Sequence, residues 1–295
     1  MTENKAKIRE QKAENEDMKS IKFVAIGHFT HDVVGDELIL GGAASYSSIA
    51  AKKLDLCAGV ITSVGKNFLH YERFNGIPLV CVETSLTTTF QNTYKNGVRS
   101  QIVKDVSAEI CPEHIPQEWR DADIVYLCPV ANEVHPDIAR MFPKSLIGAS
   151  PQGWMRQWDD QGRVSQCKWK DAPKVLPYVD VVIMSEEDIL PFPDVVDEYA
   201  NLAKVVVLTR GDRGSTAFYN GQSKDFDAFP VSVFDPTGAG DVFAVAFLKE
   251  FYRTRDLSKA SIFANCTASF VVEDEGIEGI PDLDRVLARI KSRSL

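Results

Sequence analysis

The sequence predicts an α/β protein whose mainly parallel sheet is buried by helices on both faces. After residue 20, short β-branched runs alternate with stretches of helical spacing. These runs are apolar throughout rather than alternating, which is typical of strands covered on both sides. Ligands in such folds gather at the carboxyl ends of the strands. The expected strands are, in order, Lys22–Ile26, Val60–Val64, Ile124–Leu127, Ser145–Gly148, Val179–Met184 and Val205–Thr209.

The chain divides into a charged N-terminal stretch and one continuous domain. Residues 1–20 are rich in Lys, Glu, Asp, Asn and Gln, and they hold no apolar run that could act as a signal or an anchor. This stretch is expected to be a flexible tail, with a short solvated helix as the alternative. Residues 21–295 contain no linker, no repeat and no apolar run of membrane-spanning length. A cytoplasmic protein is therefore expected.

Composition narrows the function classes without choosing one. The net charge of −9 and the pI near 5.2 disfavour nucleic acid and anionic membranes as general partners. The six cysteines include no C-x-x-C pair, and the five histidines show no metal-binding spacing. We expect reduced, buried thiols and no metal site built from these residues.

The most informative segment is Asp235-Pro-Thr-Gly-Ala-Gly-Asp241. The apolar residues that follow it have helical spacing, so a helix is predicted to begin near Gly238. Unpaired N–H groups and the positive end of the helix dipole would converge there and favour a phosphate. Asp241 would be placed to accept a hydroxyl proton. The alternative is an ordinary turn with an aspartate in the first helical turn.

Two other phosphate-binding patterns fail on inspection. The segment 27–32 follows the first strand but lacks the G-x-G-x-x-G turn of a dinucleotide fold. The segment 59–66 has its glycines one residue too far apart for a P-loop, and Asn67 stands where Ser or Thr would hold magnesium.

The Asp235–Asp241 motif and its Phe-rich helix resemble the C-terminal signature of the ribokinase, or PfkB, carbohydrate kinase family. The resemblance extends over residues 21 to 285. It implies a three-layer α/β/α sandwich with a small, reduced β lid, and transfer of the ATP γ-phosphoryl group to a hydroxyl of a sugar or polyol. Asp241 would be the catalytic base, and Gly238, Ala239 and Gly240 would form the anion hole. It further implies Mg²⁺, allows a monovalent cation, and leaves monomer or homodimer open.

The same resemblance assigns the acceptor site. Asp32, after the first strand, would bind substrate hydroxyls, and Gly41 and Gly42 match the family's N-terminal Gly-Gly signature. Without side chains these glycines let the backbone approach a polyol, or they only form a turn. Lid strands are expected at about residues 82–105, around an Asn-Gly turn. Further substrate contacts are expected from Gln91, Asn92 and Arg99 in the lid, and from Gln152 and Arg156 at a strand's carboxyl end.

The donor side is assigned in the same way. Met184-Ser-Glu-Glu-Asp188 stands where the family has Asn-x-x-Glu, so Asp188, with Glu187 as a substitute, would organise magnesium through water. The alternative is that Ser185 simply caps the next helix. The nucleotide-binding residues implied are Ser185, Thr209, Gly211, Gly214, Thr237 and Asn265.

Several departures from the family pattern leave the acceptor open. Tyr46 stands where sugar-binding members have Asn, and Asn67 replaces a common Asp. Only residues 33–40 separate the first strand region from the Gly-Gly signature, so the lid segment inserted there must be very short. The pattern is similar to inositol-kinase-like short members. A nucleoside kinase of the same fold and a non-catalytic metabolite-binding protein stay as alternatives.

Overall fold

The computed structural model describes residues 21–95 and 98–293, with the side chains of 94–99 left out. The expected N-terminal tail and the Asn-Gly turn at 96–97 therefore lie outside the described residues. In the described part, no helix is both long and apolar enough to cross a membrane.

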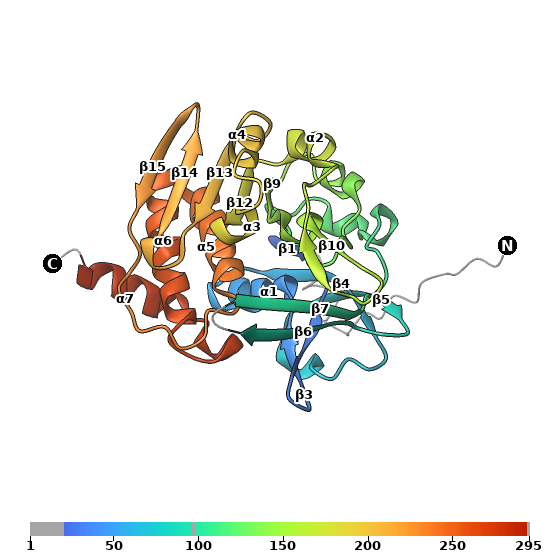
Figure 1. Ribbon diagram of the computed structural model, residues 1–295. Coiled ribbons are helices and arrows are strands. Elements are labelled where there is room, and N and C mark those ends of the chain that lie inside the picture. Colours follow the sequence, from blue (N-terminus) through green and yellow to red (C-terminus); the bar gives the residue numbers. More distant parts are fainter. Residues whose placement is uncertain (1–20, 96–97, 294–295) are drawn as a thin grey trace.

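A large sheet forms the centre of the molecule (Figure 1). Its strand order is β15-β14-β13-β12-β9-β8-β1-β4-β5, and the strands from β13 to β5 are all parallel. The two strands at the β15 edge are antiparallel. The expected α/β class with a mainly parallel sheet is confirmed. The parallel strands are β1 (Phe23–Ile26), β4 (Ala58–Gly65), β5 (Leu79–Thr84), β8 (Ile124–Leu127), β9 (Leu146–Ala149), β12 (Val181–Ser185) and β13 (Val205–Thr209), followed by β14 (Ser215–Tyr219) and β15 (Gln222–Phe226).

Long helices cover one face of this sheet. They are α1 (Ala43–Lys53), α5 (Ala239–Thr254) and α6 (Leu257–Val271), with α7 (Leu283–Arg293) packed outside α6. Asp256 starts α6, because its carboxylate accepts hydrogen bonds from the amides of Ser258 (2.8 Å) and Lys259 (3.1 Å). Phe23 and Ala25 of β1 point into this layer, while Val24 and Ile26 point to the opposite one. The strand is thus buried on both faces, as its uniform apolar sequence requires.

Short helical pieces cover the other face. Prolines occupy the first positions of most of them, which suits a helix start but prevents a long regular helix before it. This is why no strong helical periodicity marks this layer in the sequence. The pieces are η3 (Pro112–His114), η4 (Gln117–Trp119), η5 (Pro136–Met141), η6 (Pro151–Met155), α2 (Ala172–Val175), η7 (Leu176–Tyr178), α3 (Glu186–Ile189) and α4 (Val195–Ala200).

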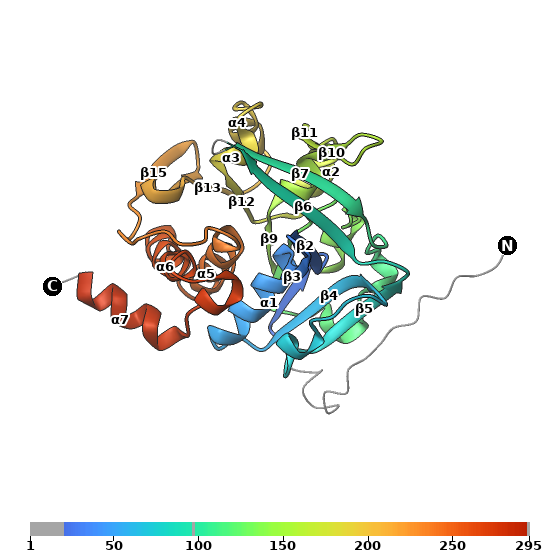
Figure 2. The same ribbon diagram turned by 60° about the horizontal axis from the view of Figure 1, so that its bottom comes forward.

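A second, four-stranded sheet lies at the carboxyl ends of the central strands (Figure 2). Its order is β3 (Glu37–Gly41), β2 (Thr30–Val34), β6 (Thr88–Lys95) and β7 (Val98–Asp105). Since β1 ends at Ile26 and β5 at Thr84, both chain crossings into this sheet leave from the carboxyl edge. The segment 33–40 is short, yet it supplies most of the β2–β3 hairpin. Residues 82–84, included in the expected lid range, belong instead to β5 of the large sheet.

Buried polar contacts hold the small sheet at its base. Asn67 Oδ1 accepts hydrogen bonds from the amide and the hydroxyl of Thr87, each at 2.9 Å. The His28 ring lies between Thr88 Oγ1 (2.7 Å) and the carbonyl of Ala108 (2.8 Å). Burial lowers the pKa of His28, so the imidazole is neutral at physiological pH and bridges the start of β6 to the segment that follows β7. These contacts join the small sheet to the end of β1 and the loop after β4.

Candidate active site

The segment 235–241 forms a tight loop that leads into α5, as the sequence predicts. Gly238 is the N-cap residue of α5 and has a left-handed conformation, with φ of 77°. A Cβ at this position would also lie 2.0 Å from the ring of Tyr46, so only glycine fits. Asp235 shapes the loop, because its carboxylate accepts hydrogen bonds from the amides of Thr237 (2.9 Å) and Gly276 (3.1 Å).

The three residues predicted to form an anion hole differ in their hydrogen bonds and in the space around them. The amide of Ala239 donates to the carbonyl of Pro236 at 3.3 Å, within a turn. Gly240 is exposed, and a Cβ placed on it would meet nothing within 4 Å. Neither packing nor a positive φ therefore requires glycine at 240. Its missing side chain leaves open space in front of the helix N-terminus, where an anion is favoured.

Asp241 lies in the first turn of α5 beside this space. Removal of its carboxyl group from water, and next the charge of Asp188, raise the pKa of Asp241 to about 7. The charge of Arg156 acts in the opposite direction. A carboxyl group with a pKa near neutrality is suited to general base catalysis at physiological pH. The structure thus brings together three residues that the sequence assigned to separate roles.

Asp188 is held by two hydrogen bonds. Its Oδ1 accepts one from Gln152 Nε2 at 3.0 Å, and its Oδ2 accepts one from the amide of Ser185 at 3.1 Å. Ser185 in turn caps α3 by accepting a bond from the amide of Glu187. The capping alternative is therefore confirmed, and the carboxylate of Asp188 is also one of the charges that act on Asp241. The exposed Glu187 is not among the charges that act on Asp241.

Arg156 joins the small sheet to the large one. Its Nη1 donates to the carbonyl of Val130 at 2.9 Å, and its guanidinium carbon lies 5.5 Å from the centre of the Phe90 ring. Phe90 belongs to β6, so the cation reaches across the gap between the sheets. A positive charge held there, near Asp241, could bind an anionic group of a substrate.

The predicted acceptor residues meet at the base of the small sheet. A Cβ on Gly41 would lie 2.4 Å from Asp32 Oδ2, so the glycine leaves room for that carboxylate. Gly42 caps α1 with φ of 93°, and a Cβ there would lie 2.4 Å from the carbonyl of His28. The glycine pair therefore has a packing reason, and Asp32 lies beside the start of α1.

The lid residues differ in their environments. Gln91 and Asn92 lie in β6, and Asn92 Oδ1 accepts a hydrogen bond from Gln101 Nε2 at 2.9 Å. Arg99 lies in β7 opposite Tyr94 of β6, and its side chain is outside the described part of the structure. Asn92 thus stabilises the hairpin itself, and the substrate roles of these three residues stay predictions.

The predicted donor loop follows β13. Thr209 ends that strand, and its hydroxyl donates to the carbonyl of Met184 at 3.4 Å. Gly211 and Gly214 have positive φ values of 59° and 84°. A Cβ on Gly214 would lie 2.0 Å from the carbonyl of Phe226, whereas one on Gly211 would meet nothing within 4 Å. Gly214 therefore has a structural reason, and Gly211 leaves open space.

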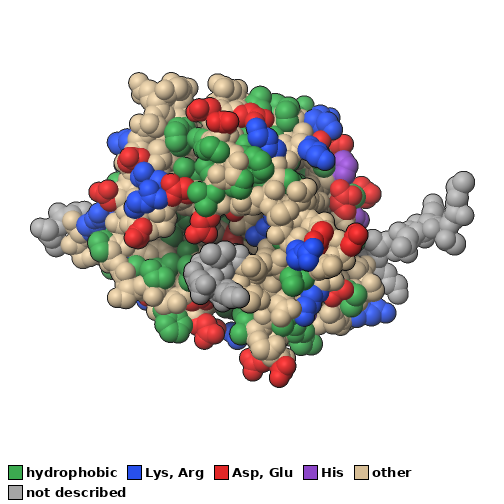
Figure 3. All heavy atoms as spheres, in the orientation of Figure 1, with side chains coloured by type: hydrophobic (Ala, Val, Ile, Leu, Met, Phe, Trp, Pro, Cys, Tyr) green, Lys and Arg blue, Asp and Glu red, His purple; other side chains and the backbone are tan. Residues whose placement is uncertain are grey.

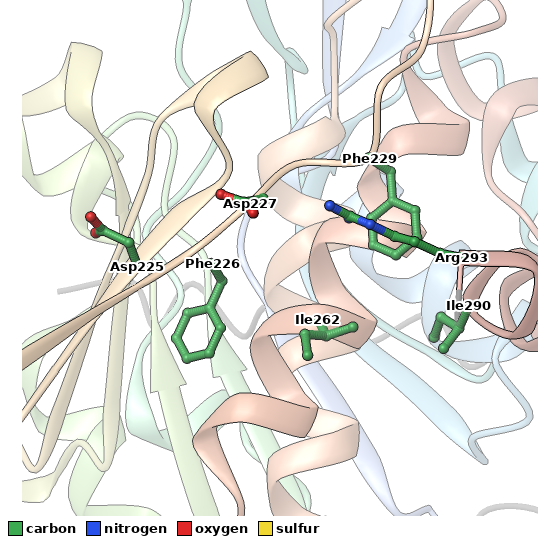
Figure 4. A pocket seen from close by; sticks show the side chains of 7 residues that line it. All are labelled: Asp225, Phe226, Asp227, Phe229, Ile262, Ile290 and Arg293. Atoms are coloured by element: carbon green, nitrogen blue, oxygen red, sulfur yellow. The ribbon is translucent and has the colours of Figure 1, made fainter. Parts of the chain in front are cut away.

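Asn265 is buried in α6 and bonded within the protein. Its Nδ2 donates to Ser215 Oγ (3.1 Å) and to the carbonyls of Phe226 (3.2 Å) and Asp227 (3.4 Å). Phe226 and Asp227 also line a hollow of about 310 Å³ between β15, α6 and α7 (Figure 4). Asn265 thus stabilises the wall of this hollow. The residues that line the hollow do not include Asp241 or Asp188.

Sequence reasoning did not predict the contacts that three residues make here: it named Asp235 and Tyr46 for other reasons, and it did not name Tyr126. Tyr46 packs under Gly238, Asp235 ties two loops together, and Tyr126 Oη lies 2.6 Å from Ser150 Oγ beneath the site. The Asp-Pro-Thr spacing is a signal for the Asp235 turn, since an aspartate often accepts the amide two residues on. The positions of Tyr46 and Tyr126 depend on tertiary packing, which local sequence does not encode.

Acidic and basic side chains are interspersed over the face seen in Figure 3. A helix start with open space before it, a carboxyl group with a raised pKa and a nearby arginine are the features that an α/β phosphotransferase with a hydroxyl acceptor needs.

The comparison with protein families agrees with this class. Residues 30–282 match the model of the pfkB family of carbohydrate kinases, so the chain belongs to that family. It is similar to a nucleoside kinase of Methanocaldococcus jannaschii, with 22% identity over 86% of each chain. It is also similar to an inositol 3-kinase of Zea mays, with 26% identity over 86% of this chain and 73% of the relative.

Solved structures share the fold. A pyrophosphate-dependent kinase in the ribokinase family, complexed with a pyrophosphate analog and myo-inositol, superposes with a TM-score of 0.75. Its sequence identity is 20%, over 90% of this chain and 99% of that one. A ribokinase from Thermotoga maritima gives a TM-score of 0.72 at 20% identity, over 92% and 99% of the two chains. The expected ribokinase-like sandwich is confirmed.

Proposed function

We propose that the protein transfers the γ-phosphoryl group of ATP to a hydroxyl of a sugar or polyol, with an inositol-like acceptor as one candidate. The observation that supports this most strongly is the position of Asp241. Its carboxyl group has a pKa of about 7 and follows directly on the open N-terminal turn of α5. Base and anion site are thus joined in one rigid element.

The proposed reaction has one step. Asp241 accepts the proton of the acceptor hydroxyl as that oxygen forms a bond to the γ-phosphorus, and the bond from phosphorus to the bridging oxygen of ADP breaks. The amides of Gly238 and Gly240 stabilise the negative charge that builds up on the transferred group. The amide of Ala239 already donates a hydrogen bond to the carbonyl of Pro236, so it stabilises the transferred group least of the three. Arg156 adds a positive charge on the side of Asp241 facing the small sheet.

The residues present fit a magnesium ion held mainly through water and phosphate. Among residues 21–95 and 98–293, no three His, Cys, Asp or Glu side chains are grouped to hold a metal by themselves. Asp188 is the fitting residue, since its carboxylate is fixed by two hydrogen bonds and still acts on Asp241. When bound, Mg²⁺ would neutralise phosphate charge. Glu187 is exposed and fits this role less well.

The acceptor would be oriented by Asp32 and the backbone beside Gly41 and Gly42, with Gln91 and Arg99 as further contacts from the lid. A carboxylate accepts hydrogen bonds from hydroxyl donors, so a polyhydroxylated ligand suits Asp32. The nucleoside kinase among the relatives keeps a nucleoside as a second acceptor candidate. The inositol 3-kinase of maize supports the polyol.

The donor needs its own test. The loop of Thr209, Gly211 and Gly214, together with Thr237, would line the nucleotide, and the hollow beside Asn265 offers room for a base. Pyrophosphate is a second donor candidate, because the solved pyrophosphate-dependent kinase shares this fold with a TM-score of 0.75. A purely metabolite-binding role would not require a base such as Asp241.

The experiment is a panel of inositols, pentoses, hexoses and nucleosides, each offered with Mg-ATP and with magnesium pyrophosphate. ADP and orthophosphate release distinguish the donors. A selective acceptor with ATP supports the proposal, and selective turnover with pyrophosphate alone would replace the donor. Binding of an acceptor without turnover of either donor would contradict a kinase function.

A further inference from the structure

Tyr46 lies directly beneath the start of α5. It belongs to α1, and the whole residue is only 3% exposed. A Cβ built on Gly238 would lie 2.0 Å from Tyr46 Cδ1 and 2.2 Å from Cε1. The edge of the ring is therefore in close contact with the backbone of Gly238, the residue whose left-handed conformation starts the helix.

The far end of the same side chain reaches a second loop. A Cβ on Gly276 would lie 3.5 Å from Tyr46 Oη. The amide of Gly276 donates a hydrogen bond to the carboxylate of Asp235. The same carboxylate accepts a hydrogen bond from the amide of Thr237, within the segment 235–241, which we call the anion loop. Ring and carboxylate together hold the anion loop and the Gly276 loop in one arrangement.

We propose that Tyr46 is a positioning residue for phosphoryl transfer, whose aromatic ring fixes Gly238 and thereby aims the amides at the start of α5. This inference rests on the proposed kinase function. The ring is rigid and carries the contact to Gly238, while the hydroxyl points to the other loop. The function assigned to Tyr46 is thus carried by its ring.

The charges around Tyr46 fit this assignment. Burial, and then the carboxylates of Asp235, Asp32, Asp241 and Glu275, all raise the pKa of its phenol. The phenol therefore stays neutral at physiological pH and adds no charge to a site that must hold a phosphate. The ring also fills space among these acidic groups that water would otherwise enter.

A smaller side chain at position 46 has two expected effects. The backbone at Gly238 loses its support, so the amides are aimed less accurately at the transferred group. Water also enters beside Asp241, and because desolvation is the largest cause of its raised pKa, hydration lowers that pKa. The acid limb of the rate profile would then move to lower pH.

The test compares Tyr46→Phe, which keeps the ring, with Tyr46→Leu and Tyr46→Met, which remove it. We expect Tyr46→Phe to keep kcat within about two-fold, because the ring contact is intact. We expect the aliphatic variants to lose about 10- to 100-fold in kcat, since small displacements of positioned groups cost this much. The acceptor KM should change far less than kcat, and the acid midpoint of kcat/KM should fall.

A matched control separates positioning from stability. Tyr199, in α4, is also almost fully buried, but it lies in the opposite core layer. Tyr199→Leu should lower the urea midpoint and leave kcat and its pH profile unchanged. If Tyr46→Leu fails to fold, Tyr46→Met serves as the second ring-free variant.

Equilibrium binding provides a readout that needs no acceptor. Titration calorimetry with pyrophosphate should show weaker binding to the aliphatic variants and unchanged binding to Tyr46→Phe. This comparison can be made even if the panel identifies no acceptor. A failure of the proposed kinase function is therefore distinguishable from a failure of the role proposed for Tyr46. Aliphatic variants that match the wild-type protein in pyrophosphate binding would overturn the inference, as would a Tyr46→Phe variant as impaired as Tyr46→Leu.

Discussion

The carboxylate of Asp188 raises the pKa of Asp241, although the two residues come from different layers of the fold. Gln152 and the amide of Ser185 hold Asp188 in place with bonds of 3.0 and 3.1 Å. Burial is the larger cause of the raised pKa, and the charge of Asp188 is the second. The proposed base and the residue that acts on its pKa thus lie in the first turns of two separate helices, α5 and α3.

The pH dependence of turnover should follow this relationship. A base with a pKa of about 7 is active only when deprotonated, so kcat/KM should rise with pH through about 7. Asp188→Asn removes a negative charge, lowers the pKa of Asp241 and should move the acid midpoint to lower pH. The control is Asp121→Asn, which removes a carboxylate from the exposed ion pair with Lys144 just before β8, at the opposite edge of the sheet from the carboxyl ends. An unchanged midpoint in Asp188→Asn would contradict the coupling.

Asp241 should also cost the protein stability at neutral pH. Its pKa is raised in the folded state, so the folded protein binds the proton more tightly than the unfolded chain. Stability from this group is therefore full below pH 3.8 and is lost as pH rises to about 7. Asp241→Asn should raise Tm at pH 8 relative to wild type, and the gain should shrink at acid pH. Thermal unfolding across pH measures this, and a lower Tm for the variant at pH 8 would contradict it.

The two glycines of the anion loop should respond differently to alanine. Gly240→Ala meets no protein atom within 4 Å, so stability should stay the same or rise by up to about 1 kcal/mol. Turnover should nevertheless fall by about ten-fold or more, because the methyl group enters the space for the transferred phosphate. Gly238→Ala combines a φ of 77° with a clash against Tyr46, and should lower stability and turnover together. Urea unfolding and initial rates distinguish the two, and full activity in Gly240→Ala would place the phosphate elsewhere.

The base of the small sheet should depend on Asn67. Its Oδ1 is the acceptor for both the amide and the hydroxyl of Thr87. Asn67→Ala leaves these partly buried donors unpaired and should cost about 1–3 kcal/mol in the free energy of unfolding. Asn67→Asp keeps an acceptor oxygen and should cost less. Equal losses in the two variants would show that the hydrogen bonds are not what stabilises this junction.

The sequence alone predicted six of the nine strands of the large sheet in the described residues, but not β5, β14 and β15. Uniform apolar runs fixed β1, β8 and β13 to within a residue, because strands buried on both faces need such sequences. The proline-opened pieces such as η5 and η6 escaped prediction, since a single turn leaves no periodic pattern. The β2–β3 hairpin was missed, although Gly35 and Asp36 between its two strands are typical residues of a two-residue hairpin turn.

The candidate site was predictable only where one motif carries it. The segment from Asp235 to Asp241 is sufficient to predict a turn and a helix start, and it contains the residue proposed as the base. The links between Asp188 and Gln152, and between Tyr46 and Gly238, join distant segments and arise from packing. Asn265 was assigned to the nucleotide by resemblance, and its bonds to the carbonyls of Phe226 and Asp227 could not be predicted from the sequence; its nucleotide role stays a prediction.

The most direct measurement is ADP release from Mg-ATP by Asp241→Asn and by the wild-type protein, with the acceptor identified by the panel. ATP binding, followed by calorimetry, should be retained in the variant, because asparagine keeps the size of the side chain. Turnover should fall by about 10²- to 10⁴-fold, as for the loss of other general bases. Wild-type turnover in Asp241→Asn would contradict the central claim that this carboxylate accepts the hydroxyl proton.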